Sequence, residues 1–396
     1  MIPFVFFTVF AALSAVYALF LLRVRSGARF YETRNAEWRA DFAAREASAM
    51  PVTVIVAMRD EERCAAACIR SLRAQTYPAE RTQVIVVDDH SSDGTAAAVM
   101  DAAGDDPRFV LLRLDDAAGA AGKKSAVEAA IAHATGDAVL TTDADCVHGE
   151  DWIASMQWLL ARGNDIVGGP VLYARGNGLF ARLQALEFLG IMGTTAGLFG
   201  IGYPRLCNGA NLAYRLEAFR RVDGFSGHRH LASGEDEFLL QAIVYRAGGA
   251  AEFNPLPESA VVTPGARTLR AFLSQRARWA SKGGRYEDGR FVAFLVLLYA
   301  YFLGCSLAPL AALSSPAALL AAFLLLLVKW TLDLSVLVPA ARLLGAPVRL
   351  TDFVIAELLH PVYLVAVSTA GALGRFAWKG RKTTTAMARA RSQPSG

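Results

Sequence analysis

Acidic side chains gather at four points of the sequence where an apolar run ends or begins. The groups are Asp60 with Glu61 and Glu62, Asp88 with Asp89, Asp143 with Asp145, and Glu235 with Asp236 and Glu237. A single acidic pair is most simply explained as a solvated loop. The carboxyl ends of parallel strands, however, meet at one edge of a sheet, and ligands bind there. The four groups together therefore predict one shared polar site.

The stretch "TTDADC" is the most informative of these groups. In an extended chain Asp143 and Asp145 point to the same side, with Ala144 between them. Two carboxylates at this spacing can share a hard divalent cation, and such a cation commonly keeps substrate phosphates among its ligands. The spacing predicts that Asp143 and Asp145 bind Mg2+ or Mn2+ beside a diphosphate group.

The stretch "SGEDEFLL" places acids at the start of an apolar helix. When a hydroxyl group displaces a metal-bound diphosphate, a carboxylate must accept the hydroxyl proton. Asp236, next to Glu235, is the candidate for this base. Acids in a first turn also stabilise the helix dipole, and that simpler explanation stays open for Glu237.

Two further motifs suggest contacts with a diphosphate or an acceptor. In "QRARW", Gln275, Arg278 and Trp279 fall at i, i+3 and i+4, on one face of a helix. Arginine can bind diphosphate oxygens, and tryptophan can stack on a sugar or a lipid headgroup. In "CNGANLAYR", Asn208 and Asn211 flank a Gly-Ala pair that permits close backbone approach. Both motifs also have purely structural explanations. An amphipathic helix that enters the membrane commonly carries Arg and Trp, and Asn is common in turns.

The elements that must position these residues alternate between strand and helix. Strands are expected at "VTVIVAM", "QVIVVDD", "FVLLRL" and "DAVLTTDAD", with helices between them; the helix in "SSDGTAAAVMDAA" is expected to be capped by Ser92 or Asp93. Such alternation is typical of a mostly parallel, three-layer α/β sheet.

The composition indicates an integral membrane protein. Of the 396 residues, 54% are hydrophobic, which is too apolar for an ordinary soluble enzyme. Four apolar stretches are each long enough to cross about 30 Å of hydrocarbon: Ile2–Leu22, Phe291–Leu313, Ala317–Val338 and Phe353–Leu373. The net charge of +4 is too small to indicate nucleic-acid binding. The basic residues lie beside apolar segments, which points to membrane lipids as partners.

The first apolar stretch has no basic residue before it and no small-residue cleavage pattern after it, which favours an anchor over a signal peptide. Basic residues from Arg23 to Arg29 follow it, so the positive-inside rule places the chain up to Arg290 in the cytoplasm. Four spans would leave the tail outside, yet residues 375–396 are basic, and the rule places them inside. Glu357, His360 and Pro361 in the last stretch suggest a kinked or re-entrant segment as the explanation.

The stretch "LFARLQALEFLGIMGTTAGLFGIG" is apolar, interrupted by glycines, and contains Arg182 and Glu187. These charges favour a helix at the membrane surface, and a core helix is the alternative. The expected organisation is an anchor (1–23), a juxtamembrane segment (24–50), a cytoplasmic domain (51–290), about three membrane segments (291–374) and a basic tail (375–396).

The motifs "AMRDEE", "VDDHSSDGT", "GKKSA", "TTDAD", "GED" and "QRARW" occur in this order between about Pro51 and Trp279. This set resembles membrane-bound family 2 glycosyltransferases with the GT-A fold. The resemblance implies a Rossmann-like, mostly parallel α/β domain flanked by transmembrane helices. It also implies a divalent metal and a nucleotide-sugar donor, with a UDP-sugar favoured and a GDP-sugar as the alternative.

The resemblance implies roles for individual residues. Nucleotide binding is assigned to Ala57, Asp60, Glu61, Asp88, Asp89, Lys123 and Asp143, metal binding to Asp143 and Asp145, catalysis to Asp236 and Glu235, and contacts with diphosphate or acceptor to Gln275, Arg278, Trp279, Asn208 and Asn211. Gly234 stands where the family has a threonine, which removes one hydroxyl from the acceptor side.

These expectations combine into an inverting transferase of the cell (inner) membrane with its catalytic domain in the cytoplasm. It would move a sugar from a nucleotide sugar to a lipid or a lipid-linked glycan. A processive polysaccharide synthase is the alternative enzyme, since "QRARW" also resembles a motif of those proteins, although about three spans are few for a polymer channel. A non-catalytic nucleotide-binding scaffold is the alternative outside the enzymes.

Overall fold

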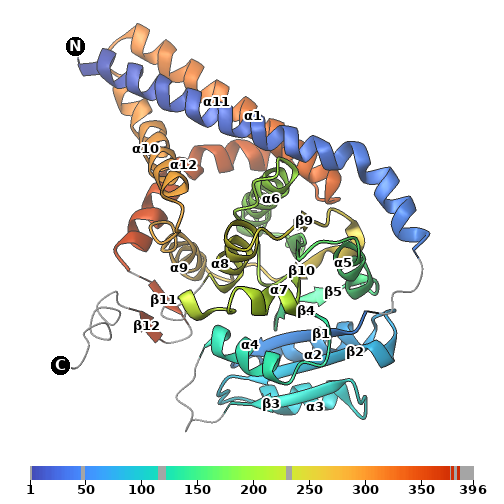
Figure 1. The fold of residues 1–396 in the computed structure, drawn as a ribbon. Helices are drawn as coiled ribbons and strands as arrows, with labels where there is room; N and C mark the ends of the chain where they lie inside the picture. The colour runs from blue at the N-terminus through green and yellow to red at the C-terminus, as the bar shows by residue number, and fades with distance from the viewer. Residues whose placement is uncertain are drawn as a thin grey trace, which may run out of the picture.

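The computed structural model describes residues 2–45, 50–114, 122–228, 234–374, 376–378 and 381–383. A seven-stranded sheet lies at one end of the molecule and long apolar helices lie at the other, with α6 (Leu179–Gly200) between them (Figure 1). Two hydrophobic cores follow this division, a larger one around the sheet and a smaller one among the long helices. The predicted α/β class with flanking apolar helices is confirmed.

The strands are short apart from those at the centre of the large sheet. Their bounds are β1 (Val52–Met58), β2 (Thr82–Asp88), β3 (Phe109–Arg113), β4 (Ala138–Asp143), β5 (Val147–His148), β6 (Ile166–Gly168), β7 (Val171–Tyr173), β8 (Leu212–Arg215), β9 (Ala251–Phe253), β10 (Val261–Thr263), β11 (Phe376–Trp378) and β12 (Arg381–Thr383). The four strands expected from the sequence are β1 to β4.

The α-helices are α1 (Ile2–Ala43), α2 (Glu62–Arg73), α3 (Thr95–Ala103), α4 (Lys123–Ala132), α5 (Trp152–Ala161), α6, α7 (Leu216–Arg221), α8 (Glu235–Gln241), α9 (Leu269–Ala280), α10 (Gly289–Ala312), α11 (Pro316–Leu343) and α12 (Leu350–Ala372). The predicted cap of α3 is wrong by one or two residues, because Gly94 precedes its first turn. Asp93 instead accepts hydrogen bonds from the backbone N–H groups of Glu62 and Thr95.

The large sheet has the strand order β3-β2-β1-β4-β8-β6-β9. β1 pairs in parallel with both β2 and β4, β2 pairs in parallel with β3, and β8 pairs antiparallel with both β4 and β6. The β-branched residues of β1 and β2 are buried, as expected for strands covered on both faces. Parallel pairing therefore directs the ends of β1, β2 and β4 to the same edge.

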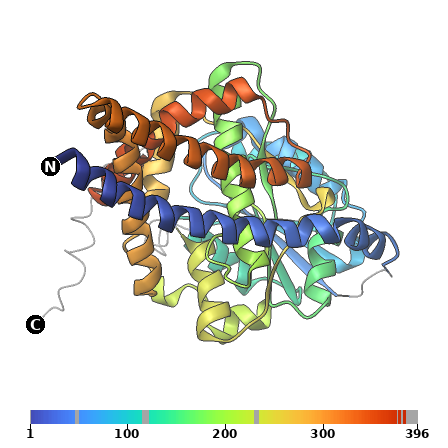
Figure 2. The same ribbon diagram turned by 90° about the horizontal axis from the view of Figure 1, so that it is seen from above.

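Among the described residues, four helices are long and apolar enough to cross a membrane: α1, α10, α11 and α12. α1 continues without a break from the predicted anchor through most of the predicted juxtamembrane segment. α1 and α11 run side by side in both views (Figures 1 and 2). Residues 46–49 of the juxtamembrane segment, and the basic tail apart from β11 and β12, lie outside the described residues.

The glycines of α6 do not interrupt the helix. Instead, the absence of side chains at these positions allows α1 to approach α6 closely. A Cβ atom on Gly197 would lie 2.3 Å from the Val24 carbonyl oxygen, and one on Gly200 would lie 2.3 Å from that of Gly27. The charges of α6 have protein partners: Arg182 pairs with Asp352 of α12 at 2.8 Å, and Glu187 pairs with Arg276 of α9 at 2.5 Å. These contacts favour the core helix over the membrane-surface helix.

We expect Gly197→Ala to destabilise the protein by about 1–3 kcal/mol, since the added methyl group overlaps the backbone of α1. Gly190→Ala is the matched control on the same helix, because no described atom outside the adjoining backbone of α6 lies within 4 Å of its Cβ position. The free energy of unfolding of the control should increase by about 0.5–1 kcal/mol, because alanine has the higher helix propensity. Thermal unfolding of the detergent-solubilised protein measures both, and equal midpoints for the two variants would contradict the close approach.

Candidate functional site

The register of the parallel strands assembles the predicted edge. Met58 of β1 lies beside Asp88 of β2, and Ala57 lies beside Asp143 of β4. A cavity of about 790 Å3 opens there. Acidic side chains from all four sequence groups line it: Glu61, Asp89, Asp143, Asp145, Glu235, Asp236 and Glu237. The predicted meeting of the four groups is confirmed.

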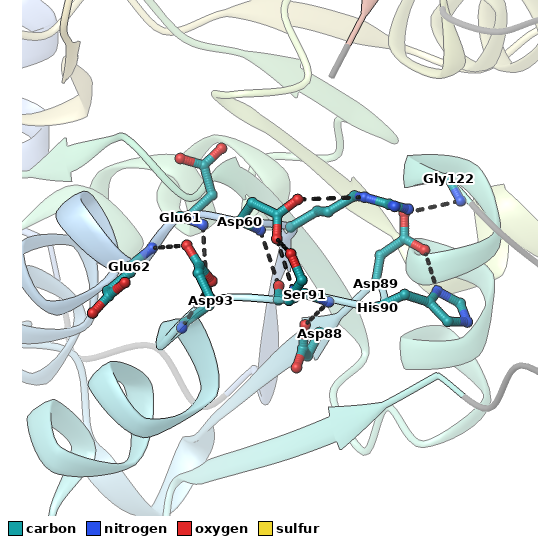
Figure 3. A network of polar contacts seen from close by, with 12 residues as sticks. Asp60, Glu61, Glu62, Asp88, Asp89, His90, Ser91, Asp93 and Gly122 are labelled. Carbon is teal, nitrogen blue, oxygen red and sulfur yellow. Dashed lines mark hydrogen bonds and ion pairs between the residues drawn. The ribbon is translucent and has the colours of Figure 1, made fainter. Parts of the chain in front are cut away.

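The loops after β1 and β2 are joined by hydrogen bonds that use several of the candidate acids (Figure 3). The Asp60 carboxylate accepts from the Ser92 backbone N–H at 2.8 Å, and Asp88 accepts from the Ser91 N–H at 2.9 Å. Neither acid is among the residues that line the cavity. Asp60 therefore joins the two loops, and Asp88 fixes the turn of the loop after β2. Both residues lie behind those that line the cavity.

Glu61 and Asp89 are the members of the same groups that face the cavity. The carboxylate of Glu61 points away from the loop network in Figure 3. Asp89 accepts hydrogen bonds from the Gly122 backbone N–H at 3.0 Å and pairs with the His90 ring at 2.8 Å. Asp89 thereby fixes the start of α4, the helix whose first residue is Lys123.

Lys123 lies among the carboxylates at the bottom of the site. Its Nζ atom is 2.5 Å from Asp143 Oδ1 and 3.4 Å from Glu235 Oε1. Burial opposes the charge, but Asp143 and Glu235 raise the pKa of the lysine above its ordinary value. Lys123 is therefore a fixed positive charge beside Asp143.

The donor set at Asp143 and Asp145 suits a divalent cation that also binds phosphate oxygens. Burial, together with the negative charges of Asp143 and Glu61, raises the pKa of Asp145 to about 6. A cation between these carboxylates would relieve that repulsion. Among the described residues no group of three or more His, Cys, Asp or Glu side chains forms a metal site. Two carboxylates plus diphosphate oxygens would match the way in which Mg2+ is usually held.

Asp236 is held as an ionised carboxylate at the start of α8. It is buried, which would raise its pKa, but Lys282 and Lys123 outweigh burial and lower the pKa below the ordinary value. The backbone N–H groups of Gly209 and Glu237 each donate to it at 2.8 Å. A carboxylate that stays ionised and faces the cavity can accept a proton.

The backbone conformation before these acids favours glycine. Gly234 adopts φ +95°, in the left-handed region, and a Cβ atom there would lie 2.8 Å from atoms of Lys282 and Phe238. A threonine at this position would be strained and crowded. The departure from the family pattern therefore follows from the local backbone of this chain.

Lys282 and Tyr286 are site residues that the sequence analysis missed. Lys282 Nζ lies 3.0 Å from Glu237 Oε2, and the Tyr286 hydroxyl donates to the same oxygen at 2.5 Å. Burial raises the pKa of Glu237. Glu237 therefore anchors α8 to the segment after α9, and Lys282 stabilises the charge of Asp236. Their only sequence signal was proximity to "QRARW".

The two asparagines of "CNGANLAYR" have different surroundings. Asn208 lines the cavity, and its side-chain oxygen accepts from the Ala210 N–H at 3.0 Å. Asn211 is fully buried and does not line the cavity. It accepts from the Trp152 indole at 2.9 Å and donates to the carbonyl oxygens of Pro170 and Ser259. The structure thus places Asn208 at the site and Asn211 in the core.

The "QRARW" residues lie on α9 as the spacing predicted. Gln275, Arg278 and Trp279 all line the cavity. Burial lowers the pKa of Arg278, although Glu235, Asp143 and Asp236 act against this decrease. The guanidinium group therefore faces the same carboxylates as Lys123.

Arg276, inside the motif, positions the residues on either side of it. Its guanidinium group donates to Gln275 Oε1 at 2.6 Å and lies 4.2 Å from the ring centre of Trp279. It also makes a two-point ion pair with Glu187 of α6, which accepts in addition from Tyr363 of α12 at 3.0 Å. Arg276 therefore fixes α9 against two neighbouring helices.

We expect Arg276→Ala to lower the free energy of unfolding by about 3–5 kcal/mol, because it leaves the Glu187 carboxylate, whose side chain is only 13% exposed, without its cation. Arg270→Ala removes an exposed arginine from the same helix and should change stability by no more than about 0.5 kcal/mol. Denaturant unfolding of both variants measures the difference. A loss for Arg276→Ala that matches the control would show that the pair contributes little.

Comparisons with known proteins indicate the family of this chain. The sequence model of the family described as glycosyl transferase family 2 matches residues 53–222, and that of glycosyl transferase family group 2 matches residues 138–333. An N-acetylglucosaminyltransferase of Azorhizobium caulinodans is 26% identical over 260 residues, which are 62% of this chain and 64% of that protein. An undecaprenyl-phosphate 4-deoxy-4-formamido-L-arabinose transferase of Pectobacterium carotovorum is 32% identical over 135 residues, which are 34% of this chain and 40% of that protein.

Both alignments therefore span less than two thirds of the relative's own length. Among solved structures, the mannosyltransferase PcManGT from Pyrobaculum calidifontis in complex with GDP-Man and Mn2+ is similar, at 21% sequence identity and a TM-score of 0.49. The match covers 91% of this chain and 98% of that one.

Proposed function

This chain belongs to glycosyl transferase family 2, and from that premise we propose that it is an inverting glycosyltransferase. It moves one sugar from a nucleotide-diphosphate sugar to an acceptor held at the membrane. One observation carries the proposal: Asp143, Asp145, Asp236 and Arg278 line a single cavity. A diphosphate site and a base that face one space suit direct displacement, which needs no covalent intermediate.

The donor would be held at the strand edge. Ala57, Glu61 and Asp89 lie where a nucleoside would bind, and Asp60 and Asp88 act on it through the loops that they hold. Asp143 and Asp145 would hold Mg2+ or Mn2+, which neutralises the leaving diphosphate. A UDP-sugar is the favoured donor and a GDP-sugar the alternative.

The residues of α9 and α8 would contact the diphosphate, the sugar and the acceptor. Arg278 is placed to bind diphosphate oxygens, and Trp279 to stack on the transferred sugar or the acceptor. Asp236 takes the proton of the attacking hydroxyl, while Glu235 holds Lys123 in place. The acceptor enters beside Asn208.

The site would work at the cytoplasmic face of the cell (inner) membrane. Four helices long enough to span a membrane flank the domain, and basic residues follow the first apolar stretch. The sides of the membrane on which the last loops and the basic tail after α12 lie also follow from this proposal. A glycosylation-acceptor or cysteine-accessibility map of each loop would test it.

Donor consumption tests the function directly. The purified chain in lipid nanodiscs with Mn2+ would be incubated with a panel of UDP-, GDP- and dTDP-sugars while released nucleotide diphosphate is measured. We expect release with one donor, increased by a crude lipid extract. Donor binding without release under every condition would support the non-catalytic scaffold, and release with long polymer formation would support the processive synthase.

A further inference from the structure

The cavity does not end at the carboxylates, because it continues between the membrane helices. Eleven of its lining residues belong to α10 and α12, among them Leu295, Val296 and Leu298 of α10 and Leu364 and Val365 of α12. None of these eleven is charged. The site therefore has a polar end at the sheet edge and an apolar end inside the proposed membrane region.

The apolar end reaches the outer surface of the helices. Val296 is 62% exposed and Tyr299 is 36% exposed, and both line the cavity. The Tyr299 hydroxyl lies 2.9 Å from Thr369 Oγ1 and so connects α10 to α12 beside the cavity. Both helices are long and apolar enough to span a membrane. A hydrocarbon chain could thus pass from the bilayer into the cavity without leaving apolar surroundings.

The polar end disfavours an anionic head group. Of the described side chains that line the cavity, seven are acidic and four are basic: Arg59, Lys123, Arg278 and Lys282. Lys123 already lies beside Asp143 and Glu235, and Lys282 beside Glu237. The donor diphosphate and its divalent cation would together add no net positive charge to this excess of acids. A second phosphate in this space would be repelled, whereas an uncharged hydroxyl group would not.

Resting on the transferase function proposed above, we infer that the acceptor is an uncharged, long-chain lipid alcohol. Its chain lies between α10 and α12, and its hydroxyl group lies at Asp236. The hydroxyl O–H bond breaks and the proton goes to the Asp236 carboxylate while the oxygen bonds to the anomeric carbon. The bond from that carbon to the diphosphate breaks, and its electron pair leaves with the nucleotide diphosphate.

The charge of the head group is tested with a matched pair of probes. Oleyl alcohol and oleyl phosphate share one chain and would be offered separately in nanodiscs with the donor that the panel identifies. We expect glycosylated oleyl alcohol to form at least about tenfold faster. Equal rates, preference for the phosphate, or donor hydrolysis with neither lipid glycosylated would overturn the inference while leaving the transferase intact. No turnover of any donor would instead overturn the proposed function.

The path of the chain is tested on α12. Ser368 lines the cavity, and Ala366, two residues earlier on the same helix, is exposed and does not line it. Ser368→Phe should reduce transfer to oleyl alcohol at least about tenfold but leave donor hydrolysis by water unchanged, because it fills only the apolar end. Ala366→Phe should leave both rates unchanged. A rate of transfer to oleyl alcohol that is unchanged in Ser368→Phe, or reduced equally in both variants, would contradict the proposed path of the chain.

Discussion

Replacing Asp236 by asparagine is expected to lower the turnover number by a factor of about 10²–10⁴ and to leave donor affinity nearly unchanged. The amide keeps the shape of the side chain, and its oxygen can still accept from the Gly209 backbone N–H. It cannot take a proton from the acceptor. Steady-state release of nucleotide diphosphate, with donor binding measured calorimetrically on the same preparation, separates the two effects.

Two control variants test whether the loss is specific to Asp236. Asp105→Asn changes an exposed acid on the turn after α3 and should be silent. Glu235→Gln weakens the contact with Lys123 Nζ, 3.4 Å away, and should reduce the rate less than Asp236→Asn. If Glu235→Gln were the more damaging substitution, the base would be Glu235. If Asp236→Asn abolished donor binding as well, its role would be structural.

Replacing Asp145 by asparagine is expected to lower metal-dependent turnover by about 10²-fold or more. The variant loses one of two carboxylates that face the cavity on either side of Ala144, and an amide oxygen is a weaker ligand for Mg2+ or Mn2+. Donor binding should also lose its dependence on added Mn2+. Calorimetric titration of the donor with and without Mn2+ measures this directly.

The chelated wild type is the reference for that experiment. Wild-type protein treated with EDTA should be as slow as Asp145→Asn, and added Mn2+ should restore the wild type but not the variant. Lys123 remains beside Asp143 in both. Full activity of the metal-free wild type would show that the fixed cations of the site suffice to neutralise the diphosphate.

The sheet edge and the long apolar helices could be predicted from the sequence because their signals are local. The β-branched runs of β1 and β2 specify buried strands. Because parallel strands end at one edge of the sheet, the acids that follow them lie close together, whatever the structure of the rest of the chain. The spacing of Gln275, Arg278 and Trp279 likewise needs only one helix. Long apolar runs likewise predict helices that are long and apolar enough to cross a membrane.

Partners contributed by distant segments could not be predicted in this way. Nothing near Asn211 indicates that Trp152, Pro170 and Ser259 satisfy its hydrogen bonds in the core. The charge of Glu187 suggested a membrane surface, yet Arg276, 89 residues away, neutralises it inside the protein. A charged side chain can face solvent, lipid headgroups or a buried partner, and its own sequence neighbours do not distinguish the three.

The sequence by itself therefore determined the family, the α/β sheet with its acidic edge, and the apolar helices. Only the tertiary structure decided which acids face the cavity, that Lys123 contacts Asp143, and that the cavity continues between α10 and α12. The physical reason is the range of the interactions. Strand and helix patterns are repeated within a few residues, whereas ion pairs and cavities form between segments that only the folded chain brings together.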